Sequence, residues 1–222
     1  MVNDEQLKQH IVDHLKNDSR VDISKLDIIV KNGNVGVEGS TDSAPVRRAI
    51  ERDIWVINGV KDVKNNVVVE VLSPPEIPKD DIIETRITNI ITWHSGIAPD
   101  DVNVKVEDAW VNLTGSVENL FEKWLIEERA LDVRGVKGVT NEIAVVPTEN
   151  IADEIIAQKI VDKLERNKFL NVDDITVVIE DGEVSLKGNV RNKMAHDAAF
   201  DSALFTLGVK SIENDLIIEN PL

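Results

Sequence analysis

The sequence predicts an α+β protein of three tandem α-β-β-α-β modules, each a small three-stranded mixed sheet covered on one face by two helices. Three observations lead to this prediction. A glycine that ends an alternating apolar segment is followed twenty residues later by Gly-Val-Lys, and this happens three times: Gly39 and Gly59, Gly115 and Gly135, Gly188 and Gly208. The three segments align without a gap at offsets of 76 and then 73 residues. Within each one, helical and strand periodicities alternate in the same order, as expected for copies of one folded unit.

The repeat divides the chain into module one (4–71), module two (80–147) and module three (153–220). Residues 72–79 and 148–152 are the expected linkers. The first of them contains three prolines, at 74, 75 and 78, which stiffen a linker without fixing its angle.

Each module is expected to begin with an amphipathic helix and to continue into a β-hairpin. Apolar residues spaced four apart form one stripe on the helix: Leu7, Ile11 and Leu15; Ile83, Ile87 and Ile91; Ile156, Ile160 and Leu164. In the second strand of the hairpin, three pairs should face the core: Val35 and Val37, Val111 and Leu113, Val184 and Leu186. The turns are Asn32-Gly33, Asp108-Ala109 and Asp181-Gly182, and only the second lacks the glycine that adopts positive φ freely.

A second helix and a last strand complete each module. The glycines that end the second strand, Gly39, Gly115 and Gly188, should occupy positions where a Cβ would be strained or would block the approach of helix and sheet. The second helix has a weaker apolar face: Ala49, Ile50 and Ile54; Leu125, Ile126 and Ala130; Ala198, Ala199 and Ala203. Asn65, Asn141 and Asn214 share one column just before the last strand, where a short polar side chain is expected to satisfy backbone groups.

Charge argues against a nucleic-acid partner. The chain has a formal net charge of −16, of which −2, −7 and −6 fall on modules one, two and three and −1 on the linkers. Binding to a polyanion depends on clustered lysine and arginine, so modules two and three are poor candidates for nucleic acid or an anionic membrane. Module one could offer a basic patch through Arg47, Arg48 and Arg52, although a solvated helix face is the commoner explanation of such residues.

The residues that carry chemistry are sparse, and we expect no enzyme, no catalytic residue, no cofactor and no metal site. His10 and His14 are spaced like two metal ligands on a helix, but no third ligand is spaced to join them, so we expect an exposed helix face. Asp100-Asp101 and Asp173-Asp174 lack the spacing of a calcium loop, which leaves only a loose cation site as an alternative. There is no cysteine and no glycine-rich phosphate loop.

The tryptophans are the sharper signal. Trp55 shares its column with Leu131 and Leu204 and should be core. Trp93, Trp110 and Trp124 all lie in module two, at columns that are polar in both sibling modules, and with the three arginines they form the candidate binding surface. Burial against the flanking modules, contact with a partner or membrane, and incidental exposure are the three explanations that the sequence leaves open.

The pattern resembles the BON domain family of bacterial modules. Its signature is a hairpin Asp-Gly, a strand that ends apolar-x-apolar-x-Gly, and Gly-Val-x-x-Val-x-Asn before the last strand. Module three matches through Gly182, Gly188, Gly208, Val209, Ile212 and Asn214, and module one through Gly33, Gly39, Gly59, Val60, Val63 and Asn65. Module two departs at Ala109. The resemblance implies a non-enzymatic role: attachment to phospholipid membrane surfaces, protection of the envelope under stress, or chaperone-like binding.

We therefore expect a tandem BON-domain binding protein with a membrane phospholipid or a protein as partner and no nucleic acid. The alternatives are a soluble scaffold that associates with itself or with identical chains, and a module that binds a small ligand or a cation, which would need a pocket. The first residues have neither a basic nor an apolar region of a signal peptide. A cytoplasmic location is thus expected, or a periplasmic one if a leader has been removed.

Overall fold

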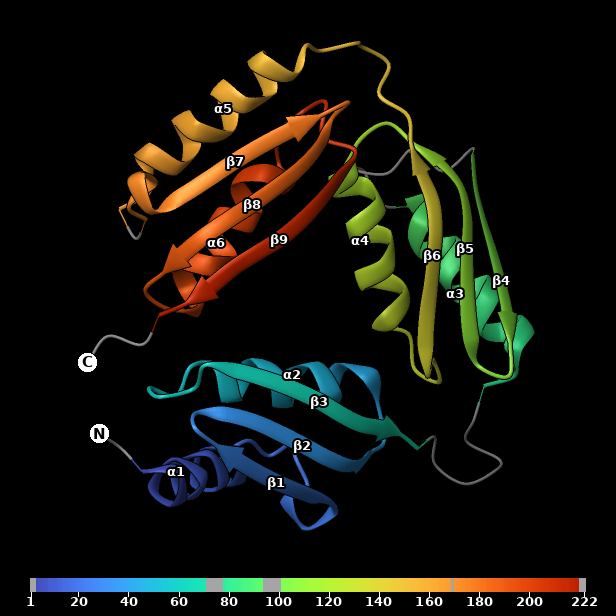
Figure 1. Cartoon of the computed structure of the whole chain (residues 1–222). Helices are drawn as coiled ribbons and strands as arrows, with labels where there is room; N and C mark the ends of the chain where they lie inside the picture. The colour runs from blue at the N-terminus through green and yellow to red at the C-terminus, as the bar shows by residue number, and fades with distance from the viewer. Residues whose placement is uncertain (1–2, 71–77, 94–100, 169, 220–222) are drawn as a thin grey trace.

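The computed structural model describes residues 3–70, 78–93, 101–168 and 170–219, which form three α+β modules (Figure 1). Module one contains α1 (Asp4–Lys16), β1 (Leu26–Lys31), β2 (Asn34–Thr41), α2 (Ala44–Trp55) and β3 (Asp62–Val69). Module two contains α3 (Asp80–Trp93), β4 (Val102–Glu107), β5 (Trp110–Val117), α4 (Leu120–Leu131) and β6 (Gly138–Val145). Module three contains α5 (Asp153–Arg166), β7 (Ile175–Glu180), β8 (Glu183–Val190), α6 (Lys193–Leu204) and β9 (Ser211–Ile218). The predicted fold class is confirmed; residues 71–77, most of the first linker, lie outside the described residues.

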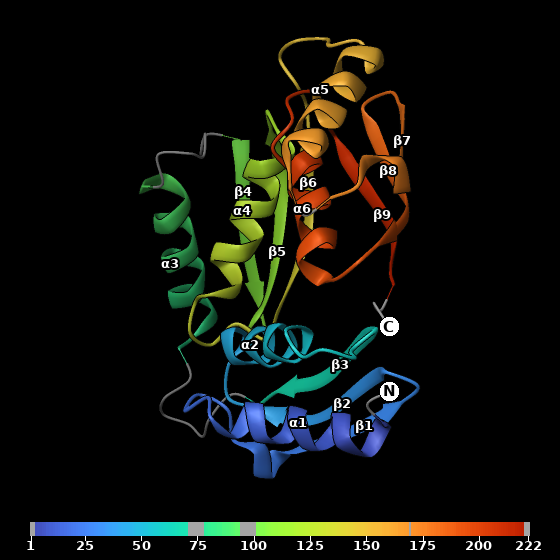
Figure 2. The same ribbon diagram turned by 90° about the vertical axis from the view of Figure 1, so that its left-hand side faces the viewer.

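Each sheet has the second strand of its module in the middle. In module one, β2 pairs antiparallel with β1 and parallel with β3. The parallel pair requires a crossover, which α2 provides. The two helices of each module lie on one side of its sheet (Figures 1 and 2).

Each module has its own hydrophobic core. The stripe of the first helix is buried in all three modules, as are the six strand residues predicted to face inward. The weaker face of the second helix is also buried, except that Ala198 is only half-buried. Two single turns of 3-10 helix, Ile23–Lys25 and Val172–Asp174, precede β1 and β7 and were not predicted.

The backbone explains the glycine that ends each middle strand. Gly188 has a φ of +130°, and a Cβ there would lie 2.0 Å from the carbonyl oxygen of Asp174. Gly39 and Gly115 have the same conformation and the same close carbonyl. A side chain at this column would therefore meet both an unfavourable φ and a fixed backbone atom.

A carboxylate at the start of each first helix binds the hairpin turn of its module. In module three, Asp153 accepts hydrogen bonds from the backbone N–H groups of Asp181 (2.8 Å) and Gly182 (2.9 Å). Asp4 and Asp80 do the same in the other modules. We name these three residues the hairpin aspartates. Module two keeps this turn although Ala109 replaces glycine, with a φ of +67° at Ala109.

Asn65, Asn141 and Asn214, which share one column of the repeat, join the second helix of each module to its last strand. In modules one and two the amide nitrogen donates to a helix carbonyl, Asn65 to Arg47 (2.9 Å) and Asn141 to Lys123 (3.1 Å). In module three the amide of Asn214 lies 3.2 Å from Nε2 of His196 instead. In every case the side-chain oxygen accepts from the backbone N–H two residues later. The prediction that these residues satisfy backbone groups is thus extended, because each also joins two elements.

Candidate binding surfaces

Arg48 joins modules one and two. Its guanidinium forms an ion pair with Asp132, which caps the C-terminus of α4, and its Nε lies 3.9 Å from a carboxylate oxygen of Glu128. A cation is favoured at this end of a helix by the orientation of the backbone dipoles. One of the three arginines expected to form a basic patch is therefore engaged between modules.

The other two arginines differ in their surroundings. Arg47 is exposed and donates to the backbone oxygen of Asn65 at 3.3 Å. The side chain of Arg52 is 66% exposed, with its Nε 3.7 Å from Asp53. Only Arg47 shares a surface with Arg48.

That shared surface is a hollow of about 230 Å³ at the junction of modules one and two. Module one contributes α2 residues together with Asn65, and module two contributes the starts of β5 and β6. Its lining includes Arg47, Arg48, Glu51, Trp110, Lys137 and Gly138. The structure thus brings together three residues of the predicted candidate surface, Arg47, Arg48 and Trp110.

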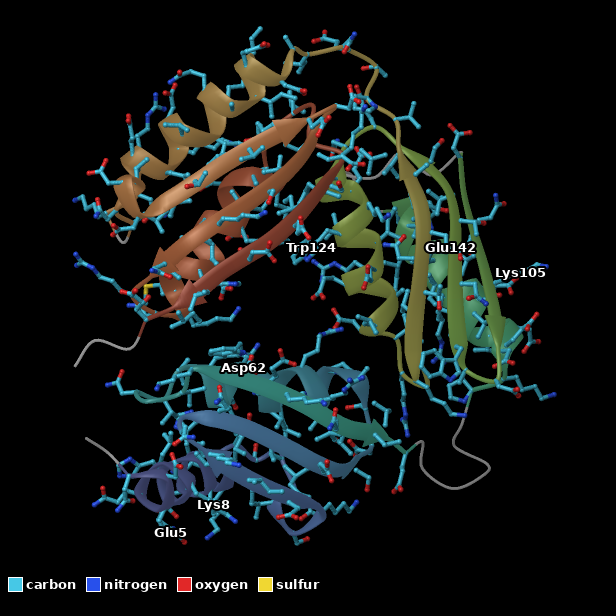
Figure 3. All side chains as sticks on the ribbon, in the orientation of Figure 1. Glu5, Lys8, Asp62, Lys105, Trp124 and Glu142 are labelled. Atoms are coloured by element: carbon cyan, nitrogen blue, oxygen red, sulfur yellow. The ribbon has the colours of Figure 1, made fainter. Side chains whose placement is uncertain are left out.

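Aromatic residues join modules two and three. On α4 the rings of Phe121 and Trp124 stack with centroids 6.1 Å apart, and Phe121 meets the ring of Phe205, beyond the end of α6, at 5.0 Å. Leu120 packs against the core of module three. Trp124 lies on the side of α4 that is turned toward module three and remains 38% exposed (Figure 3).

Trp55 and Lys193 connect modules one and three. Trp55, predicted to be core, is half-buried: it packs against the core of module one and carries the ammonium of Lys193 5.4 Å from its ring centroid. A cation in this position is attracted by the electron-rich ring face.

The three contacts form a cycle. Arg48 of α2 meets the end of α4, Phe121 of α4 meets the end of α6, and Lys193 of α6 meets Trp55 at the end of α2. The second helices of the three modules accordingly face one another in Figures 1 and 2. The three contacts use different chemistry, since one is ionic, one aromatic and one a cation–π interaction.

Trp93 takes no part in this cycle. It is 84% exposed at the end of α3. Burial against flanking modules accordingly describes Trp110 and Trp124 in part and does not describe Trp93.

A basic and apolar rim on module three was not singled out by sequence reasoning. Lys159, Lys163 and Arg166 of α5 surround a hollow of about 290 Å³ together with Phe205 and Leu207. The two apolar side chains are 52% and 61% exposed. The signal in the sequence was the spacing of the three cations at i, i+4 and i+7, which places them on one helix face. We call these five residues the module-three rim.

Lys163 shapes the rim from within. Its ammonium donates to the carbonyl of Phe205 (2.8 Å) and to the hydroxyl of Thr206 (2.7 Å), which fixes the segment after α6. Burial, and then repulsion from Lys159, lower the pKa of Lys163. The exposed cations of the rim are therefore Lys159 and Arg166.

The histidine and aspartate pairs considered as metal or cation sites do not form a ligand cluster in the described residues. His10 and His14 are exposed, and no group of three or more potential metal ligands occurs among residues 3–70, 78–93, 101–168 and 170–219. Asp100 lies outside the described residues, and Asp173 is exposed. Within the described helices, none has the length and apolar character needed to cross a bilayer.

Comparisons with known proteins agree with the repeat. The BON domain family model matches three times, at residues 3–71, 79–147 and 152–220. Osmotically-inducible protein Y of Escherichia coli (strain K12) is 27% identical over 143 residues, which cover 62% of this chain and 71% of that protein. Outer membrane lipoprotein DolP of Haemophilus influenzae is 31% identical over 138 residues, covering 60% of this chain and 71% of that protein.

Solved structures add little. The C-terminal domain of CdsD, a structural protein of the type III secretion system of Chlamydia trachomatis, aligns over 95% of this chain and 96% of that domain. The TM-score is 0.27 and the identity 13%, a likeness too weak to bear on function.

Proposed function

Because this chain belongs to the BON domain family, we propose that it is a non-enzymatic binding protein of the envelope stress response that attaches to anionic phospholipid surfaces. Two relatives support a role in the envelope under stress, since one is named for osmotic induction and the other is an outer membrane lipoprotein. The attachment surface is our own proposal and rests on the module-three rim.

The observation that carries the proposal is the combination of exposed cations and exposed apolar side chains on that rim. Lys159 and Arg166 are exposed, and Phe205 and Leu207 stand beside them. Surfaces that lie on a membrane combine cations for lipid phosphates with apolar side chains for the acyl boundary. Asp162 also lines the hollow, so three cations stand against one carboxylate there. The remaining negative charge of module three acts from further away, and screening limits such effects to about 8 Å at physiological salt.

Module one remains a competing attachment site through its arginines. Arg48 is engaged by Asp132, so Arg47 and Arg52 are the ones that a membrane would meet. These two arginines provide a matched comparison for Lys159 and Arg166, with two charges removed in each case.

The test is co-sedimentation of the full chain with vesicles of phosphatidylcholine, with and without phosphatidylglycerol. Wild type should prefer the anionic vesicles, and high salt should remove the preference. The double variant Lys159→Gln/Arg166→Gln should bind them about tenfold to thirtyfold less tightly, since each cation near an anionic surface contributes about 1 kcal/mol. Leu207→Ser should weaken binding to a smaller extent, whereas Arg47→Gln/Arg52→Gln should not.

Other outcomes have distinct meanings. Loss of binding only in the arginine variant would move the site to module one. Equal binding by wild type and both double variants would refute an electrostatic site on either module. Failure of wild type to bind any vesicle would favour the scaffold alternative.

A further inference from the structure

We propose that the hollow between modules one and two is a binding site for a small aromatic anion, such as a planar ring that carries a carboxylate. This site is distinct from the module-three rim and does not depend on attachment to a membrane. Its lining comes from both modules, so an occupant would contact both.

The first observation is an unused hydrogen-bond donor. Nη1 of Arg48 is buried and has no hydrogen-bond partner in the described part of the chain. The opposite side of the same guanidinium is occupied, by Asp132 at Nη2 and by Glu128 near Nε. A buried N–H without a partner costs free energy comparable to the desolvation of that group. Arg48 lines the hollow, so a ligand acceptor bound there would remove this cost after a small shift of the guanidinium that uncovers Nη1.

The second observation is the charge around the hollow. Arg47 donates to the carbonyl of Asn65 at 3.3 Å, and Lys137 donates to the carbonyl of Asp108 at 3.1 Å. Both acceptors are neutral. Glu51 is the carboxylate of the lining, and it accepts from Asn65 at 3.4 Å. Because Asp132 and Glu128 pair with Arg48, the cations without a carboxylate partner in the lining are Arg47 and Lys137, and two of them against Glu51 favour an anionic ligand over a cationic one.

The third observation is a half-covered indole. Trp110 pairs with Gly138 across β5 and β6, and a Cβ on Gly138 would lie 2.3 Å from a ring carbon of Trp110. One face of the ring therefore rests on the glycine, while the side chain remains 52% exposed. A free ring face next to a cavity suits stacking with a planar group.

This arrangement belongs to module two alone. The repeat places Asn34 and Glu183 at the column of Trp110, and Asp62 and Ser211 at the column of Gly138. Gly138 and the tryptophan that packs on it thus occur together, in the module that shares the hollow with Arg48. Together with the unpartnered N–H, they indicate a ligand that combines a flat ring with an anionic oxygen group.

Benzoate is the simplest probe with both features. We expect titration of the ¹⁵N-labelled full chain with benzoate to shift the indole N–H resonance of Trp110 and the amide of Gly138, in a saturable manner. Benzyl alcohol lacks the charge, and acetate and inorganic phosphate lack the ring. All three should bind at least tenfold more weakly than benzoate.

Variants separate the site from the fold. Arg48→Lys keeps the charge that pairs with Asp132 but removes the guanidinium fork, and should weaken benzoate at least tenfold. Gly138→Ala should do the same by displacing the indole. Trp93→Phe, at an exposed tryptophan that does not line the hollow, should leave binding unchanged. The remaining spectrum reports whether each variant is folded.

Three results would overturn the proposal. The first is the absence of any saturable shift at Trp110 with benzoate. The second is equal binding of benzyl alcohol, which would indicate a plain apolar pocket. The third is full benzoate affinity in both Arg48→Lys and Gly138→Ala.

Discussion

The carboxylate of Asp153 accepts a hydrogen bond of 2.9 Å from the backbone N–H of Gly182, 29 residues further along the chain. The bond joins the first turn of α5 to the turn between β7 and β8. Because the same bond recurs from Asp4 to Gly33 and from Asp80 to Ala109, the hairpin aspartates are a feature of the repeat. Each helix start thereby fixes a turn whose residues have positive φ.

Replacing a hairpin aspartate should loosen its own module. Asp153→Ala removes two charge-assisted hydrogen bonds, and we expect a loss of about 1–2 kcal/mol, at the low end for such bonds because the site is partly exposed. The three modules need not unfold together, so the measurement is native-state hydrogen exchange at amides of β7 and β8. Glu154→Ala, at the exposed neighbour, is the control. Equal protection in the two variants would contradict the prediction.

Gly188→Val should destabilise module three by on the order of 3 kcal/mol. The new Cβ would meet the carbonyl oxygen of Asp174 at 2.0 Å, in a conformation that valine rarely adopts. Gly36→Ala offers a comparison, because the nearest atom to that Cβ is 4.0 Å away and φ is ordinary. Denaturant midpoints should fall for the first and change little for the second; an unchanged midpoint for Gly188→Val would refute the assignment.

Module two should gain stability from Ala109→Gly. Release of the positive φ at Ala109 is worth about 1–2 kcal/mol, against about 0.8 kcal/mol for the buried methyl group, so the net gain is about 0.2–1.2 kcal/mol. The reverse change in module three, Gly182→Ala, should be destabilising, since its Cβ would lie 2.7 Å from the carbonyl oxygen of Gly208. Thermal unfolding of both variants checks the sign, and a loss of stability in Ala109→Gly would show that the methyl contact dominates.

Asp53→Asn should stabilise module one at neutral pH. Burial, and then the neighbouring carboxyl of Asp18, raise the pKa of Asp53. A carboxyl with a raised folded-state pKa disfavours folding when it is ionised, and this cost disappears as the pH falls below both its folded and unfolded pKa values. The advantage of asparagine should therefore be full at neutral pH and vanish under acid. Urea titrations of wild type and Asp53→Asn at neutral and at acid pH measure the difference, and an equal advantage of asparagine at both would contradict the prediction.

Much of each module could be predicted from the sequence because the repeat gives three residues to compare at every aligned position. A stripe such as Ile83, Ile87 and Ile91 is convincing when its counterparts share its spacing. The hairpin aspartates escaped notice although they also share a column, because a carboxylate in a first helical turn is already explained by the helix dipole. The backbone N–H groups of the hairpin turn that this carboxylate also binds lie 28 and 29 residues away, so the contact is visible only in three dimensions.

The candidate surfaces were harder to predict for a related reason. Contacts between modules occur at columns where the copies differ, so Arg48, Trp124 and Asp197 have no common chemistry to compare. The module-three rim was hidden by net charge, since a total over a whole module conceals three cations on one helix face. Trp110 lies near Arg47 and Arg48 only because modules one and two pack against each other. Comparing aligned positions of the repeat gives no information about that packing.

The cycle of second helices has a consequence for assembly. Each contact joins two unlike surfaces, the N-terminal half of one second helix and the C-terminal end of another. Between separate molecules, such head-to-tail contacts either close into a ring or extend into a filament. Here Lys193 of the last module returns to Trp55 of the first, so the series closes within one polypeptide. Polymerisation through these surfaces would require one of the three contacts to open first.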